Sequence, residues 1–194
     1  MKALKTIACS VTIGAALTLG GCASIISATS EEPIAEDTGS RTWGSYVEDE
    51  VIENKALVNI SKGSEELRNA NIAVTSYNGV VLLTGQVPSD ASRQEAENIA
   101  NQVRKVRKIH NELTVSGPVS TIVKSNDIYL TSRIKVELLA NEQVEGGRIK
   151  VVTENGVVYM MGLVSSSEAD AAVNIVRSVS GVQKIVKVFE YVNR

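Results

Sequence analysis

Two pairs of apolar runs dominate the hydrophobic pattern of this chain, and a polar Asn-Gly dipeptide divides each pair. The runs are rich in valine, leucine, isoleucine and tyrosine, and they cover residues 71–77, 80–87, 148–154 and 157–164. A tight type I′ turn needs positive φ at both central positions, which Asn-Gly supplies. The pattern therefore predicts two β-hairpins, with turns at Asn78-Gly79 and Asn155-Gly156.

Helical patterns flank both hairpins. A polar turn after each hairpin leads into an alanine-containing amphipathic segment, and Ser165 and Glu168 have the spacing of a capping box. A further strand pattern closes each unit. The expected helices are 46–61, 91–104, 126–141 and 169–178, and the expected closing strands are 108–115 and 184–192.

The chain repeats itself. Asn78-Gly79-Val80 recurs as Asn155-Gly156-Val157, 77 residues further on. We therefore expect an α+β protein with two tandem α-β-β-α-β units, each with two helices packed on a three-stranded mixed sheet. The first repeat is expected at residues 46–115 and the second at 124–194, with a turn-rich linker at 116–123.

The N-terminus has the pattern of an export signal. Lys2 and Lys5 precede an uncharged apolar stretch at 6–19, which is too short for a stable membrane-spanning helix. The sequence Leu19-Gly20-Gly21-Cys22 that follows resembles a bacterial lipobox. The resemblance implies a signal peptide at 1–21 and acylation of Cys22, whereas the alternative is a secreted protein with a free thiol. Residues 22–45 are polar and are expected to form a flexible tether.

The composition limits the kinds of functional site that the chain can form. The chain has one His, two Cys and a formal net charge of −2. We therefore expect no metal site, no cofactor, no catalytic residues and no nucleic-acid partner. The first repeat carries 8 basic and 10 acidic residues and the second carries 9 and 8, so the second is slightly more basic.

Three segments share short sequence motifs. A hydrophobic-x-hydrophobic-x-Gly-x-Val pattern follows each Asn-Gly turn, at 81–87 and 158–164, and Val-x-Gly-Val-x-x-Ile precedes the last strand, at 179–185. In this order the motifs resemble the pattern of the BON domain. The first repeat departs from the pattern, because Arg104-Lys105 stands where Ser-Gly is expected.

A lipobox, a tether and two BON units together resemble the dual-BON outer-membrane lipoproteins. The resemblance implies a lipid-anchored monomer on the periplasmic face of the outer membrane. It also implies binding of anionic phospholipid and support of envelope integrity at division sites. Periplasmic envelope or division proteins are further partners that it implies.

The first helix of the second repeat is the expected lipid-binding element. It carries two apolar stripes, although a helix packed on a sheet needs only one. Leu130, Ile134 and Leu138 form one stripe, while the second includes Leu139. Tyrosine suits a membrane interface and arginine offers phosphate several donors, and by resemblance the matching helix binds lipid. The candidate phospholipid-binding residues are Ile128, Tyr129, Ser132, Arg133 and Val136.

Three alternatives remain open at this point. The second stripe could instead pack against the other repeat. The protein could also be an envelope scaffold that binds a protein partner and touches the membrane only through Cys22. The basic run Arg104–Lys108 could contact lipid headgroups or an acidic partner, or it could be a solvated helix end.

Overall fold

Both predicted hairpins form, and each is extended by a third strand into a mixed sheet. The structure is a computed structural model that describes residues 41–193. The predicted signal peptide, the predicted acylation site Cys22 and most of the predicted tether lie outside the described residues.

The first repeat contains every predicted element and a short additional helix. Its central strand β2 pairs antiparallel with β1 and parallel with both β3 and β4. In chain order the elements are α2 (Trp43–Ser61), α3 (Glu65–Asn69), β1 (Asn71–Tyr77), β2 (Val80–Val87), α4 (Asp90–Asn101), β3 (Lys108–Asn111) and β4 (Thr114–Val115).

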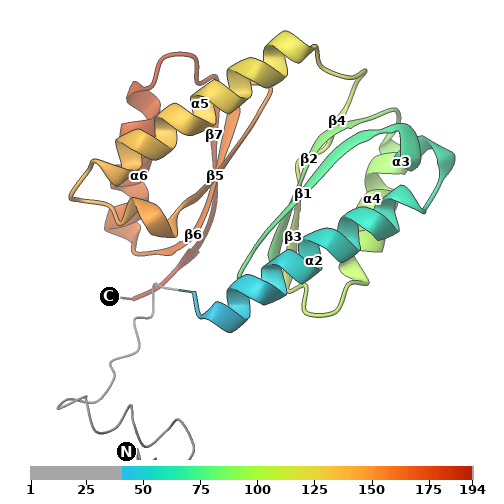
Figure 1. Ribbon diagram of the computed structural model, residues 1–194, viewed down its shortest axis with the longest axis horizontal. Helices are drawn as coiled ribbons and strands as arrows, with labels where there is room; N and C mark the ends of the chain where they lie inside the picture. Colours follow the sequence, from blue (N-terminus) through green and yellow to red (C-terminus); the bar gives the residue numbers. More distant parts are fainter. Residues whose placement is uncertain (1–40, 194) are drawn as a thin grey trace, which may run out of the picture. The chain divides into compact units, whose positions relative to one another are not determined.

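The second repeat has the same order, and Figure 1 shows α5 and α6 on one face of its sheet. Strand β6 is central, antiparallel to β5 and parallel to β7. The elements are α5 (Thr121–Leu139), the 3-10 turn η1 (Gly146–Arg148), β5 (Lys150–Glu154), β6 (Val157–Val164), α6 (Ser166–Ser178) and β7 (Lys184–Tyr191). The α+β fold with two helices on a mixed sheet is thus confirmed.

Several element boundaries differ from those predicted. Helix α2 begins inside the expected tether and α5 inside the expected linker, because Thr42 and Ser120 cap them: each side-chain oxygen accepts the backbone N–H three residues on. The last strand of the first repeat is broken into β3 and β4. There the Asn111 side chain accepts the Leu113 N–H at 3.3 Å, and this local turn interrupts the strand.

Each repeat has its own hydrophobic core between helices and sheet. In the first repeat, Ile52, Ala56 and Ile60 of α2 pack against Val81 and Leu83 of β2. In the second repeat, Leu130, Ile134 and Leu138 of α5 pack against strand residues that include Met160. One stripe of each long helix is thereby buried.

A third cluster joins the sheet faces that point away from the helices. Every residue of β2 is buried, since alternate side chains enter different clusters on its two faces. The shared cluster contains Tyr77, Val80, Leu82, Tyr159, Met161 and Val188. The two repeats therefore meet through their sheets.

Candidate functional site

A buried carboxylate fixes the position of α5 on its sheet. Asp127 accepts the backbone N–H groups of Asn155 at 2.8 Å and Gly156 at 2.9 Å, which are the two residues of the hairpin turn. These residues have φ of 48° and 73°, as a type I′ turn requires. Helix α5 begins at Thr121, so Asp127 lies inside the helix, where its carboxylate binds the turn.

The first repeat has the same arrangement with more donors. Asp49 of α2 accepts the N–H groups of Asn78 and Gly79 and the Ser76 hydroxyl, and it pairs with Arg41 at 2.9 Å. Burial alone would raise the pKa of Asp49, but the hydrogen bonds together outweigh it, so the pKa lies below its ordinary value. Asp49 therefore has a structural role.

The second stripe of α5 is exposed along its length. The exposed fraction is 68% for Ile128, 58% for Tyr129, 65% for Val136 and 67% for Leu139. The alternative in which this stripe packs against the first repeat is therefore wrong. Its apolar side chains are left open because the sheets, and not the α5 face, make the contact between repeats.

The polar members of the candidate site lie on the same helix turns. The Arg133 Nη1 atom lies 3.4 Å from the Tyr129 hydroxyl, one helical turn away, and both side chains are exposed. The Ser132 hydroxyl donates to the Ile128 carbonyl at 2.9 Å, which occupies its proton within the helix. Arg133 is thus the candidate residue with donors best suited to a phosphate group.

The α5 face adjoins a hollow on the side of β5. This cavity, about 370 Å³, is lined by Ile128 and Ser132 of the candidate site together with Lys124, Thr131 and residues of the two sheets. Lys124 Nζ lies 3.0 Å from the Asn71 side-chain oxygen, so a second cation borders the exposed stripe.

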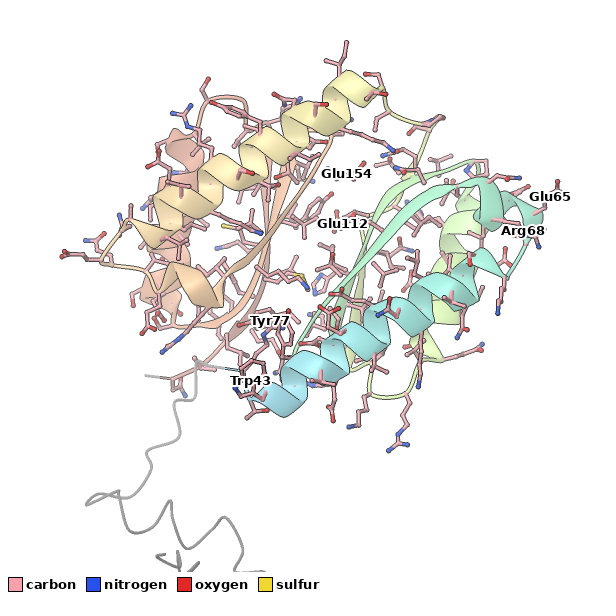
Figure 2. All side chains as sticks on the ribbon, viewed as in Figure 1. Trp43, Glu65, Arg68, Tyr77, Glu112 and Glu154 are labelled. Atoms are coloured by element: carbon pink, nitrogen blue, oxygen red, sulfur yellow. The ribbon has the colours of Figure 1, made fainter. Side chains whose placement is uncertain are left out.

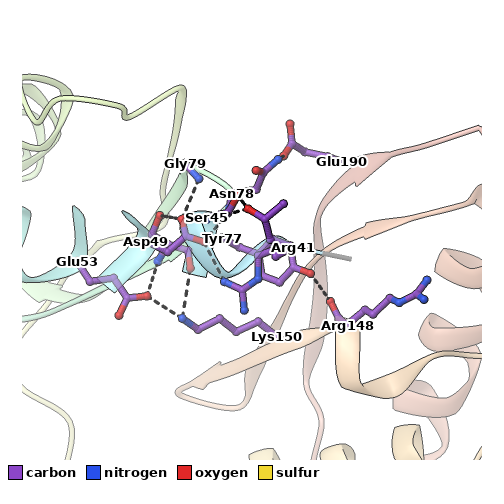
Figure 3. Close-up of polar contacts among 12 residues, drawn as sticks. Arg41, Ser45, Asp49, Glu53, Tyr77, Asn78, Gly79, Arg148, Lys150 and Glu190 are labelled. Carbon is purple, nitrogen blue, oxygen red and sulfur yellow. Dashed lines mark hydrogen bonds and ion pairs between the residues drawn. The ribbon is translucent and has the colours of Figure 1, made fainter. Parts of the chain in front are cut away.

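Polar contacts on the rim hold the two repeats together (Figure 3). Lys150 pairs with Glu53 at 2.7 Å, and the Tyr77 hydroxyl donates to the Arg148 carbonyl at 2.7 Å. Arg107 binds Glu190 through both guanidinium Nη atoms, at 2.6 and 3.1 Å. These bonds surround the apolar cluster shared by the sheets.

The basic run Arg104–Lys108 lies in a different setting from the predicted helix end. Helix α4 ends at Asn101, so residues 104–107 lie in the turn before β3, and Lys108 is the first residue of that strand. Lys105 pairs with Glu48, and Arg107 with Glu190. Two of the four cations are therefore already engaged by carboxylates of the chain.

Comparison with known proteins identifies the fold family. The BON domain family model matches residues 48–117 and 126–193. The chain belongs to the BON-domain family. Repeat 1 and repeat 2 are hereafter called BON1 and BON2.

Three curated relatives share most of their length with this chain. The 21 kDa hemolysin of Actinobacillus pleuropneumoniae is 40% identical over 152 residues, 78% of each chain. Outer membrane lipoprotein DolP of Haemophilus influenzae is 34% identical over 193 residues, covering 100% of this chain and 99% of DolP. Osmotically-inducible protein Y of Escherichia coli is 32% identical over 155 residues, 77% of this chain and 75% of that protein.

The full-length similarity supports an envelope-associated BON protein of the outer-membrane lipoprotein kind. Among residues 41–193, every helix is too short or too polar to cross a bilayer.

Proposed function

We propose that this protein is a non-enzymatic, lipid-anchored outer-membrane protein that faces the periplasm and binds anionic phospholipid through α5 of BON2. Cys22 carries the anchor, and the bound lipid surface serves envelope integrity at division sites. The observation that supports the proposal best is the exposed stripe of α5, in which Ile128, Tyr129 and Val136 are open to solvent beside Arg133.

The chemistry of this stripe fits a bilayer surface. Contiguous exposed apolar side chains are a characteristic of interaction surfaces. Tyr129 combines an apolar ring with a polar hydroxyl, which suits the headgroup boundary. Arg133 and Lys124 supply positive charge at the edge of the stripe, and each basic residue near an anionic surface contributes about 1 kcal/mol of attraction.

The test measures vesicle binding by variants of the full chain. All of them carry Cys22→Ser, which removes the anchor. Tyr129→Glu places a negative charge on the stripe and is expected to weaken binding to anionic vesicles by about tenfold or more, the equivalent of about 1.4 kcal/mol. Leu57→Glu is the matched control, because Leu57 is an exposed apolar residue on the first helix of BON1.

Circular dichroism checks that both variants remain folded. Loss of binding in Tyr129→Glu alone supports the site. Equal binding by Tyr129→Glu and the parent Cys22→Ser chain contradicts it. Absence of vesicle binding by both chains would instead leave a scaffold that contacts the membrane only through Cys22.

A further inference from the structure

The N-terminal end of α2 carries an aromatic pair that the core does not use. Trp43 is the first residue of the helix and is 86% exposed, while Tyr46 is 47% exposed. Their ring centroids lie 6.3 Å apart at an interplanar angle of 71°. Figure 2 shows Trp43 at the end of BON1 opposite Glu65 and Arg68.

Contacts at the N-terminal end of α2 hold the aromatic pair in place. Thr42 caps the helix by accepting the Ser45 N–H at 3.1 Å. The Arg41 guanidinium lies 5.3 Å from the Tyr46 ring centroid and 3.9 Å from that of Tyr77. Because Arg41 also pairs with buried Asp49, this end of the helix is fixed to the BON1 core.

A shallow hollow and a short apolar stripe extend the aromatic surface. The hollow, about 400 Å³, is lined by Trp43, Tyr46 and Tyr77 with Arg41 and Arg148. On the outer side of α2, Val47 and Val51 follow Trp43 at four-residue intervals and are exposed. Large exposed aromatic rings next to arginine are typical of residues at a bilayer–water boundary.

The position of this surface along the chain indicates its occupant. Trp43 follows Cys22 by 21 residues, which even fully extended reach no more than about 75 Å. An anchor at Cys22 therefore keeps the aromatic pair near one membrane. Anchoring makes each later contact intramolecular, so even a weak interfacial contact becomes populated.

We propose that Trp43 and Tyr46 form a second membrane contact, in which their rings insert into the interfacial region of the bilayer that holds Cys22. Exposed Glu50 lies on α2 near the stripe, and Glu48 is paired with Lys105. Negative charge near the stripe does not favour an anionic surface. The aromatic rings therefore drive the contact, which does not require anionic lipid. It shares the acylated Cys22 with the proposed function but is independent of the α5 site.

Trp43 is the only tryptophan of the chain, so its fluorescence reports this contact directly. The acylated full chain is reconstituted into vesicles of zwitterionic phosphatidylcholine, with and without acyl-chain bromination. We expect Trp43 emission to shift to shorter wavelength relative to the Cys22→Ser chain in buffer, and to be quenched by the brominated lipid.

A matched reporter at the far end of BON1 is the control. Trp43→Phe combined with Arg68→Trp moves the tryptophan to exposed α3, and this variant should show little shift or quenching. Equal quenching of both reporters, or quenching of neither, overturns the proposal.

A third variant separates the two membrane sites. In the acylated Tyr129→Glu chain, Trp43 is expected to be quenched as in the unsubstituted chain. Loss of Trp43 quenching in this variant would show that the contact depends on the α5 site. Failure of the α5 site itself is detected in the other experiment, by the binding of the unanchored chain to anionic vesicles.

Discussion

The carboxylate of Asp127 accepts the Gly156 N–H at 2.9 Å, and this contact is repeated between Asp49 and Gly79 at the same distance. In each BON domain, one aspartate in the first helix thus satisfies the backbone of a tight turn. Because the helix and the hairpin are joined by these bonds, the turn also determines where the opposite, exposed face of the helix lies.

Removal of either carboxylate should destabilise its domain. Asp127→Ala leaves the N–H groups of Asn155 and Gly156 without their acceptor, and each buried unsatisfied group costs about 1–3 kcal/mol. We expect the free energy of unfolding to fall by about 2–4 kcal/mol, measured by denaturant titration. Asn126→Ala, at an exposed neighbouring position, should change it little. Equal stabilities of the two variants would contradict the role of Asp127.

Asp49 should make stability depend on pH in the acid range. Its pKa in the folded protein lies below the ordinary value of 3.8, because the hydrogen bonds to the carboxylate outweigh its burial. The contribution of Asp49 to the free energy of unfolding is therefore complete above about pH 4, and it is lost as the pH falls through the folded-state pKa. Asp49→Asn should be less stable at pH 7, and its deficit should shrink below pH 4. Urea titrations across pH measure this, and a constant deficit would refute it.

Two adjacent methionines should separate the domain core from the shared cluster. Met160 and Met161 are both fully buried, but Met160 faces α5 and α6 whereas Met161 faces BON1. Each Met→Ala substitution should cost about 2–5 kcal/mol. We expect Met160→Ala to reduce amide exchange protection mainly in BON2, and Met161→Ala to reduce it in both domains. Unchanged protection of BON1 in Met161→Ala would show that the sheets are not energetically coupled.

Arg133 should contribute charge to lipid binding. With the unanchored chain, Arg133→Ala should weaken binding to anionic vesicles by about fivefold, which corresponds to about 1 kcal/mol, and should reduce the salt dependence. Arg177→Ala removes an exposed arginine from the end of α6 in the same domain and serves as control. Equal losses in the two variants would indicate a general charge effect and no site at α5. Vesicle co-sedimentation at several salt concentrations measures both.

The elements were predictable because their signals are local. Asn-Gly between β-rich runs specifies a hairpin through the φ angles of two residues, and the capping box of Ser165 and Glu168 is present as the spacing predicted. The predictions failed where a distant residue decides the outcome. The role of Asp127 has no local signal, because the N–H groups that it binds come from a turn almost thirty residues away.

The exposed stripe of α5 was visible as a pattern, but its meaning was not. Periodicity shows that Ile128, Tyr129 and Val136 share a face opposite the core, yet it does not say whether another domain covers that face. One sequence signal that points to the sheets is the run of four consecutive apolar residues Val80–Leu83 in β2, which is typical of a strand buried on both faces. The significance of Trp43 was likewise hidden, since a lone tryptophan in a sequence is usually buried.

The sequence by itself thus determined the two repeats, their hairpins, their helices and the apolar stripes, because each depends on residues close together in the chain. Only the tertiary structure decided that Leu82 and Met161 meet across the two sheets while the second stripe of α5 stays open. The physical reason is that burial depends on which of several apolar faces pack together. This packing is set by contacts between residues that lie far apart in the sequence.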